Sequence, residues 1–318
     1  MLSDGKTGSE NQCLGLAEAV GCRPELKRIA ARLPWRALPP ALWLSPMAAL
    51  GPGSDAIAAP WPRLLIASGR QTVAVAAAIR RRANGATFAV QLLDPRIAPS
   101  RFDLVVAPEH DGLAGDNVIA TKGALHGVNA ARLGDAAERF RPRLAALPRP
   151  LVAVLVGGAN AAYRFGAAEA ARLAAGLRAA AASDGAGFVV TASRRTGAEA
   201  LAALHTGLDG LPAELWTGEG ENPYLGYLAL CDAIVVTADS VNMVSEAAST
   251  GKPVHVFELP GGKAKFRRFH AAFAEAGITR PFEGRIGRWG YAPLDETGRV
   301  AALIRRRLGL GVGAGQDD

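Results

Sequence analysis

Short apolar runs alternate with longer alanine-rich stretches along most of the chain. Strands buried on both faces of a parallel sheet read as continuous apolar runs, and parallel neighbours need helical crossovers between them. The alternation therefore predicts repeated βα units and an α/β fold. A low aromatic content of 6% fits helices packed on such sheets.

These runs place strands and helices in both halves of the chain. The first-half strands are expected at Arg63–Ala67, Thr87–Leu93, Leu104–Ala107 and Val118–Thr121, with helices at Leu14–Val20 and Thr72–Arg82. The second-half strands are expected at Leu151–Val156, Gly187–Thr191, Glu214–Trp216, Ala233–Thr237 and Val254–Glu258. The helices expected there are Gly166–Ala182, Gly197–His205, Val241–Ser249, Lys265–Ala276 and Asp295–Leu308. Only Met1–Ser3 precede the first polar loop, so either the first strand is very short or the natural start lies upstream.

A proline-rich stretch, Arg141–Pro150, separates the two series of units and is the best candidate for a linker. A chain of 318 residues accommodates two domains of about 150 residues each. We therefore predict two Rossmann-like domains, over residues 1–145 and 146–318, with parallel sheets facing across a cleft. The last helix is either part of the second domain or packs back on the first.

The segment Trp35–Pro62 is rich in Pro, Gly and Ala and has no clear period, which predicts a loop with short helices. Its apolar residues include Trp35, Trp43, Leu44, Met47 and Leu50. This group either packs in the interior or forms an exposed patch for a lipid or a partner.

Composition excludes several classes of protein. Hydrophobic residues make up 49% and charged residues 20% of the chain, which indicates a globular protein. The three cysteines are far apart, and neither they nor the histidines show metal-ligand spacing. We therefore expect no disulfide framework, no metal site and a reducing, cytoplasmic location. No apolar run is long enough to span a membrane.

The net charge of +7 and the isoelectric point of about 9.7 allow two interpretations. The excess of basic residues reflects either genomic base composition or attraction to anionic lipid or to a phosphate-bearing substrate. Nucleic acid is the least favoured partner, because the sequence contains no recognisable binding module and no interleaved aromatics. Nothing in the sequence indicates an oligomeric state.

The loop Asp4–Gln12, DGKTGSENQ, leads into the first helix and is the first candidate site. Its glycines allow close approach of a ligand, and the helix amides favour an anion. Lys6 either contacts a phosphate or carboxylate or is solvated. Glu10 either serves the helix start or acts as a general base whose pKa is raised by desolvation.

Two further polar groups follow strands of the first half. The first group is Ser68, Gly69, Arg70, Gln71 and Thr72. It lies between a strand and a helix, where open α/β sheets bind ligands, although Ser68 or Thr72 is equally a helix cap. The second group is Glu109, His110 and Asp111, which either lines the cleft or is solvated.

Two loops of the second half suit a phosphate. One contains Gly157, Gly158 and Asn160, and its glycines let the backbone approach a pyrophosphate or the other domain. The other contains Ser193, Arg194, Arg195 and Thr196. Two guanidiniums beside helix amides form a phosphate clamp, and the alternative is a solvated surface. The dinucleotide pattern GxGxxG does not occur here, which argues against a plain NAD fold.

The strongest candidate is Thr237–Pro253, TADSVNMVSEAASTGKP. A buried strand ends there and a helix begins at Ser240, whose hydroxyl and following amides can bind a diphosphate. Glu246 follows on the same helix, where its carboxylate could accept both hydroxyls of a ribose. The alternative is an ordinary capped helix.

These motifs resemble known families at two levels. The Ser240–Pro253 segment resembles the donor-site signature of glycosyltransferase-B enzymes, including lipid-A disaccharide synthase, the lipid II N-acetylglucosaminyl transferase and the Kdo transferases. Nearly the whole chain is similar to the ELM-type "mitochondrial fission" family. The matching pieces are DGKTGSENQ, SGRQT, QLLDPR, GGAN, TASRRTG, ENPY and TADSVNMVSEAASTGKPVHVFEL.

The resemblance implies a glycosyltransferase-B-like fold that holds a nucleotide-sugar donor in its C-terminal domain. The implied donor residues are Gly157, Gly158, Asn160, Ser193, Arg194, Arg195, Thr196, Ser240, Asn242, Met243 and Glu246. The acceptor side is expected at Asp4, Lys6, Ser68, Gly69, Arg70, Gln71, Glu109 and His110. Glu10 stands where a glutamate of the Kdo transferases acts as general base. This superfamily typically needs no metal or cofactor, and the sequence has no DxD motif.

We therefore expect transfer of a sugar from a nucleotide sugar to an envelope acceptor, lipid-linked acceptors included. The protein would be cytoplasmic and peripheral on the inner face of the cytoplasmic membrane. One alternative is a nucleotide-sugar epimerase with the same fold, and another is a non-catalytic scaffold that recruits partners. No motif specifies the base, the sugar, the acceptor or the stereochemical outcome.

Overall fold

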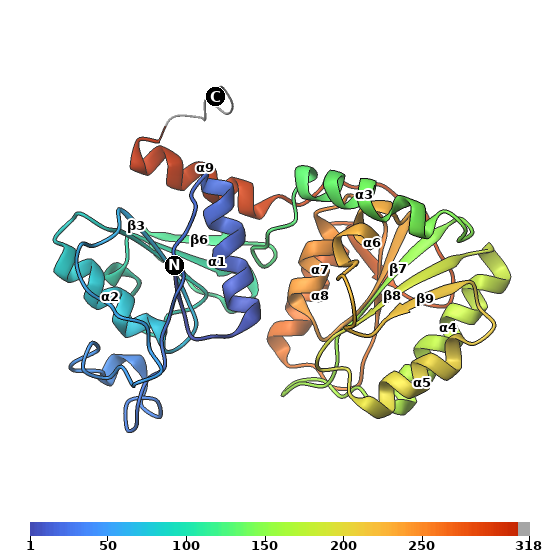
Figure 1. Ribbon diagram of the computed structural model, residues 1–318, viewed down its shortest axis with the longest axis horizontal. Helices are drawn as coiled ribbons and strands as arrows, with labels where there is room; N and C mark the ends of the chain where they lie inside the picture. Colours follow the sequence, from blue (N-terminus) through green and yellow to red (C-terminus); the bar gives the residue numbers. More distant parts are fainter. Residues whose placement is uncertain (311–318) are drawn as a thin grey trace. The chain divides into compact units, whose positions relative to one another are not determined.

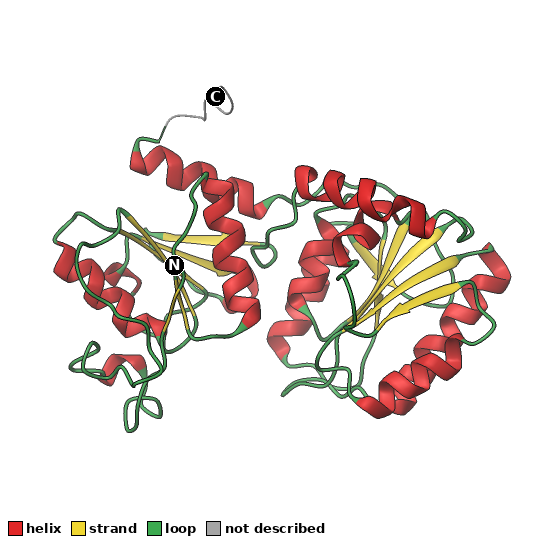
Figure 2. Cartoon of the chain, viewed as in Figure 1, coloured by secondary structure: helices red, strands yellow, loops and turns green. Residues whose placement is uncertain are grey.

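The computed structural model describes residues 1–310 and divides into two compact α/β units (Figures 1 and 2). The first unit comprises Met1–Gly127 together with the segment from Asp295 onward, and the second comprises Val128–Leu294. Each unit is built on one parallel sheet of six strands.

The sheet of the first unit has the strand order β2-β1-β3-β4-β5-β6. Its strands are β1 (Leu2–Ser3), β2 (Lys27–Arg28), β3 (Leu64–Ser68), β4 (Phe88–Leu92), β5 (Leu104–Pro108) and β6 (Val118–Thr121). The first strand is therefore very short, and it pairs in parallel with both β2 and β3. Because the winding direction reverses between β1 and β3, the loops after these two strands flank the switch point of the sheet.

Helices cover both faces of this sheet. They are α1 (Thr7–Val20), α2 (Thr72–Ala83) and α9 (Glu296–Leu308), with short 3₁₀ turns η1 (Pro40–Leu42), η2 (Pro99–Arg101) and η3 (Glu109–Asp111). Side chains alternate along β3, so that Ile66 packs with residues of α1 and α9 while Leu65 packs with residues of α2. The last helix thus belongs to the first unit.

The sheet of the second unit has the order β12-β11-β10-β7-β8-β9. Its strands are β7 (Leu151–Val156), β8 (Gly187–Ala192), β9 (Ala213–Trp216), β10 (Ala233–Thr237), β11 (Val254–Phe257) and β12 (Thr279–Pro281). Its helices are α3 (Ala130–Leu144), α4 (Ala167–Asp184), α5 (Ala198–Leu208), α6 (Tyr224–Leu230), α7 (Val241–Ala248) and α8 (Ala264–Glu275). Helices α4 and α5 cover one face, and α7 and α8 cover the other (Figure 1).

The central strand β7, LVAVLV, has all six residues buried, as expected for a strand covered on both faces. It pairs with β10 on one side and β8 on the other. The winding direction reverses between β7 and β10, which places the switch point of this sheet at the carboxyl ends of these two strands.

The predicted linker is wrong in its first part. Arg141 to Leu144 form the last turn of α3, with Pro142 inside the helix, because Phe140 and Leu144 are buried against the second unit's core. The side chain of Asn129 caps the helix by accepting a hydrogen bond from the Arg132 amide at 2.9 Å. The division between the units therefore falls after Gly127, earlier than the boundary expected after residue 145.

The apolar residues of the segment Trp35–Pro62 are neither all packed in the interior nor all exposed as a surface patch. Trp43 is buried, and Trp35, Met47 and Leu50 are partly buried against the same core. Leu44, in contrast, is 91% exposed. The segment is thus anchored by its tryptophans and presents leucine at the surface.

Candidate functional site

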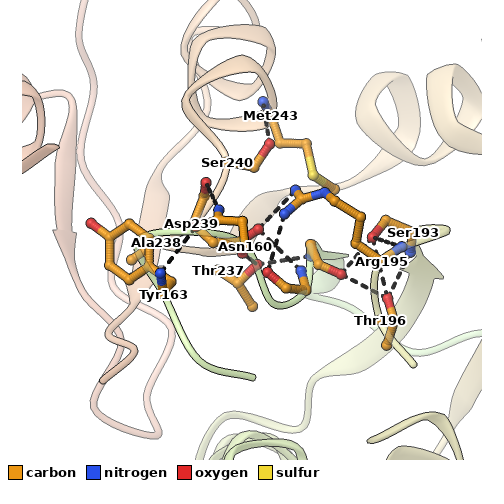
Figure 3. Close-up of polar contacts among 12 residues, drawn as sticks. Asn160, Tyr163, Ser193, Arg195, Thr196, Thr237, Ala238, Asp239, Ser240 and Met243 are labelled. Atoms are coloured by element: carbon orange, nitrogen blue, oxygen red, sulfur yellow. Dashed lines mark hydrogen bonds and ion pairs between the residues drawn. The ribbon is translucent and has the colours of Figure 1, made fainter. Parts of the chain in front are cut away.

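Three loops meet at the carboxyl edge of the second sheet, one after each of β7, β8 and β10 (Figure 3). The first is the Gly157–Gly158 loop, the second is Ser193–Thr196, and the third is Ala238–Ser240. This edge is the switch point, where open α/β sheets form their ligand crevice. The structure thus brings together the three donor-side segments predicted from the sequence.

The two glycine amides of the first loop are already occupied. Gly157 donates to the hydroxyl of Thr237 at 2.8 Å, and Gly158 donates to the carboxylate of Asp239 at 3.0 Å. The Gly157 carbonyl accepts from the hydroxyls of Ser193, at 2.5 Å, and Thr196, at 2.7 Å. In this conformation both amides therefore join the loop to its neighbours, and the expected approach of a pyrophosphate to this loop stays a prediction.

The close packing of this loop explains why it contains two glycines. A Cβ on Gly157 would lie 2.2 Å from the Asp239 carboxylate, and one on Gly158 would lie 2.0 Å from the carbonyl oxygen of Arg195. The second contact is with backbone, which has little freedom to yield. Only glycine at position 158 permits this approach of the β7 and β8 loops.

Asp239 connects the three loops, although it is not among the site residues predicted from the sequence. Its buried carboxylate accepts from Thr237 at 2.7 Å and pairs with the Arg195 guanidinium at 2.8 Å. Arg195 also donates to the Gly158 carbonyl at 3.1 Å. This arginine is therefore committed to the loop junction, while its neighbour Arg194 is exposed.

Helix α7 begins at this junction. The Ser240 hydroxyl caps it by accepting a hydrogen bond from the Met243 amide at 3.3 Å, so Asn242 and Met243 lie in its first turn. The side chain of Asn160 donates to the Asp239 carbonyl at 3.2 Å. An anion at this end of α7 would be favoured by the helix dipole and by the guanidinium held beside it.

Glu246 lies farther along α7 and receives a short hydrogen bond from the Tyr224 hydroxyl on α6. Burial raises the pKa of Glu246 to about 7, although the hydrogen bond from Tyr224 opposes this shift. Burial also raises the pKa of Tyr224 well above its usual value. The carboxyl of Glu246 thus already accepts a hydrogen bond from a hydroxyl group.

The first unit has a smaller polar group at its own switch point. The Asp4 carboxylate follows β1, is fully buried, and pairs with Lys6 at 3.1 Å. A Cβ on Gly69 would lie 2.4 Å from the Asp4 carboxyl carbon, so Gly69 closes over it. One oxygen of Asp4 and the hydroxyl of Ser68 are buried and have no hydrogen-bond partner among residues 1–310. Four of the predicted acceptor-side residues are thus gathered here.

The expected raised pKa of Glu10 is wrong. Glu10 lies in the first turn of α1 and forms a two-point ion pair with Arg28, with distances of 2.7 and 3.1 Å. The hydrogen bonds from Arg28 lower the pKa of Glu10, which outweighs the effect of burial. In this conformation the carboxylate is a weaker base than an ordinary glutamate, because its partner favours the charged form.

The other predicted acceptor-side residues either contact the segment before β3 or follow another strand, β5. Arg70 donates to the carbonyls of Ala37 and Leu38, and Gln71 accepts from the amide of Ala31. Both therefore fix the segment before β3 rather than point to a ligand. Glu109, which is exposed, and His110, which is buried, follow β5 at the same edge of the sheet.

No cluster of three or more acidic, histidine or cysteine side chains within residues 1–310 is arranged to hold a metal ion. The helices in that range also include none that is both long and apolar enough to cross a membrane.

Comparison with known proteins identifies the family. The sequence model described as Mitochondrial fission ELM1 matches residues 7–308. The chain belongs to the ELM1 family. The Mitochondrial fission protein ELM1 of Arabidopsis thaliana is 37% identical over 274 residues, which cover 78% of this chain and 64% of the plant protein. The chain thus spans less than two thirds of that relative. The Uncharacterized protein RP120 of Rickettsia prowazekii is 26% identical over 290 residues, covering 78% of this chain and 80% of that protein.

Solved structures show which fold this ELM1 family member has. The UDP-GlcNAc 2-epimerase of Methanocaldococcus jannaschii matches with a TM-score of 0.57 at 12% identity, over 98% of each chain. The UDP-GlcNAc-bound 2-epimerase of Neisseria meningitidis matches with a TM-score of 0.52 at 13% identity, over 96% of this chain and 98% of the enzyme. The fold is therefore of the glycosyltransferase-B type, as the sequence predicted.

Proposed function

We propose that the second unit binds the nucleoside diphosphate part of a nucleotide sugar and that the protein transfers the sugar to an acceptor. The observation that carries the proposal is the arrangement of α7. Its capped N-terminus lies beside the Arg195–Asp239 pair, and the same helix carries a partly buried glutamate, Glu246, that already receives a hydroxyl hydrogen bond.

The charges at this edge suit a departing diphosphate. The dipole of α7 favours negative charge at its N-terminus, where the leaving group's charge would develop. The Arg195 guanidinium is neutralised by Asp239 but keeps N–H donors for a phosphate oxygen, and the exposed Arg194 adds a positive charge to the same loop. Arg195 is held in place before any ligand arrives, so little reorganisation would accompany its binding. No metal is needed in this scheme, because backbone dipoles and guanidiniums supply the positive charge.

Glu246 would select the ribose. A nucleoside whose ribose hydroxyls replace the Tyr224 hydroxyl would donate to the same carboxylate. Hydrogen bonds to an ionised carboxylate contribute about 1.5–3 kcal/mol each. Replacement of Glu246 is therefore expected to weaken nucleotide binding about tenfold or more.

The acceptor is proposed to be an envelope molecule, with lipid-linked acceptors included, met by the first unit on the cytoplasmic side of the membrane. Asp4 and Glu10 are the carboxylates near its switch point, and both are paired with cations. Glu10 would serve as general base only after Arg28 moves away. That rearrangement is a condition of the proposal.

Isothermal titration with UDP, GDP, ADP and CMP tests the donor site. We expect one of them to bind the wild type, with loss in Ser240→Ala and Glu246→Gln. The matched control is Glu199→Gln, which removes an exposed glutamate from the first turn of α5 in the same unit. Absence of binding by every nucleotide, or equal binding in all four proteins, would overturn the proposal.

Epimerisation of a nucleotide sugar is the second candidate, because the structural relatives named above are UDP-GlcNAc 2-epimerases. Incubation with nucleotide sugars alone separates the two reactions. An epimerase yields an isomeric nucleotide sugar without acceptor, whereas a transferase releases free nucleotide only when an acceptor is present. A third candidate, a scaffold that recruits partners, follows from the name of the plant relative and predicts neither product.

A further inference from the structure

A basic depression of about 460 Å³ lies on the first unit, at the edge of the sheet opposite to Asp4 and Ser68. Its walls include Arg63, just before β3, and Asp103, just before β5. Arg80, Arg81 and Arg307 complete its charged lining. Four guanidiniums against one carboxylate give the depression a net charge of +3.

The single carboxylate of the depression is fully engaged. Asp103 forms a two-point pair with Arg80, both distances being 2.9 Å, and accepts from the Ala89 amide at 2.8 Å. Arg80 and Asp103 therefore neutralise each other. The remaining positive charge comes from Arg63, Arg81 and Arg307.

These three arginines have unused donors. Arg81 is exposed, and its guanidinium forms no hydrogen bond or ion pair with any residue in the described part of the chain. Arg63 donates to the Leu308 carbonyl, and Arg307 donates to the Asp103 carbonyl at 3.3 Å, each through one nitrogen. Each guanidinium has five N–H donors in a fork that matches phosphate oxygens. The depression thus presents donors suited to a phosphate group.

A second groove of about 340 Å³ adjoins the basic depression, since Arg80 and Arg81 of α2 line both. Its lining combines polar residues, which include Arg80, Arg81, Ser100 and Arg101, with apolar ones, which include Pro40, Trp43, Leu44, Ala74, Ala77 and Ile97. It lies between α2 and the segment that carries η1, the two being neighbours in the first unit (Figure 1). Leu44, at 91% exposure, has its side chain in water at the margin of this groove.

We propose that the depression and the groove together bind one anionic phospholipid. The phosphate would lie between Arg63, Arg81 and Arg307, and the start of the acyl part would cover Leu44 and Ala77. A phosphate without an apolar tail would leave the groove empty, and an apolar ligand would leave three guanidiniums unpaired. The chemistry of the two hollows is thus complementary to an amphiphile, and this inference stands whether or not the protein transfers a sugar.

Vesicle co-sedimentation of the full chain tests the proposal. We expect binding to vesicles of equimolar phosphatidylglycerol and phosphatidylcholine and little binding to phosphatidylcholine alone. Arg81→Gln should weaken binding about fivefold, the contribution of one basic residue near an anionic surface. Leu44→Asn should weaken it about tenfold, because the leucine would no longer be buried by the lipid.

Two matched control variants distinguish lipid binding in these hollows from non-specific attraction of the protein to the vesicle surface. Arg82→Gln removes the same charge one residue away. Leu33→Asn removes a leucine of 72% exposure that lies just before the segment Trp35–Pro62, and neither residue lines the hollows. Both controls should bind as the wild type does. Equal weakening in Arg81→Gln and Arg82→Gln, or in Leu44→Asn and Leu33→Asn, would overturn the proposed site. Binding of inorganic phosphate in titration without any vesicle binding would overturn the lipid as its ligand.

Discussion

The Asp239–Arg195 pair offers the sharpest test of how the second unit's loops are held together. In Asp239→Ala the buried amide of Gly158 loses its acceptor, and the hydroxyl of Thr237 loses one as well. An unpaired buried donor costs about 1–3 kcal/mol. The lost ion pair adds about 1 kcal/mol at most, because 42% of the Arg195 side chain is exposed and solvent screens it. We therefore expect a total loss of about 1–4 kcal/mol.

A double-mutant cycle isolates the pair itself. The single variants are Asp239→Asn and Arg195→Gln, both close in size to the native side chains. Stability is read from urea-dependent hydrogen exchange, followed by mass spectrometry of peptides from β7 and β10, so that the second unit is measured separately. We expect a coupling energy of about 1 kcal/mol, within the range for residues in contact. Additivity of the two losses within about 0.3 kcal/mol would refute the assignment of Asp239 as the residue that connects the loops.

Three further outcomes are expected. Gly158→Ala should destabilise the second unit by about 1–3 kcal/mol in the same exchange assay, because its Cβ clashes with backbone. Gly134→Ala, at a helix position with open space around it, should stabilise the unit by about 0.5–1 kcal/mol. Equal effects of the two substitutions would contradict the close packing inferred at Gly158. The folded-state pKa of Glu246 is raised from 4.5 to about 7, so its contribution to stability is present below pH 4.5 and is lost as pH rises to about 7. Glu246→Gln should therefore flatten the dependence of the free energy of urea unfolding on pH in this range. An unchanged pH dependence would contradict the shift. Arg28→Gln should raise the pKa of Glu10 toward its ordinary value, as measured by NMR titration, and no change would show that Arg28 is not the cause.

The strands and the candidate loops could be predicted because their signals are local. Runs such as LVAVLV are apolar throughout, since parallel strands are covered on both faces. Polar residues that directly follow such runs must lie at the carboxyl edge of the sheet. Gly157, Ser193 and Ser240 are therefore expected at one edge of the sheet whatever the strand order, as the structure shows.

The missed features depend on contacts between distant parts of the chain. Asp239 joins residues 158 and 195, and Arg28 reaches back to Glu10, so no sequence window contains either pair. Asp239 could have been suspected, because it follows a buried strand within a segment already selected. Helix α3 was missed because Pro142 and its charged neighbours look like a linker, while only a few apolar residues anchor the helix.

The proposed function depends on the binding of a nucleotide at the start of α7. The most direct measurement is a crystal structure of the protein with the nucleoside diphosphate that binds best in titration. The predicted result has the diphosphate at Ser240, beside Arg195, with the ribose within hydrogen-bond distance, about 3 Å, of Glu246. A nucleotide bound away from α7, with Tyr224 still on Glu246, would contradict the account.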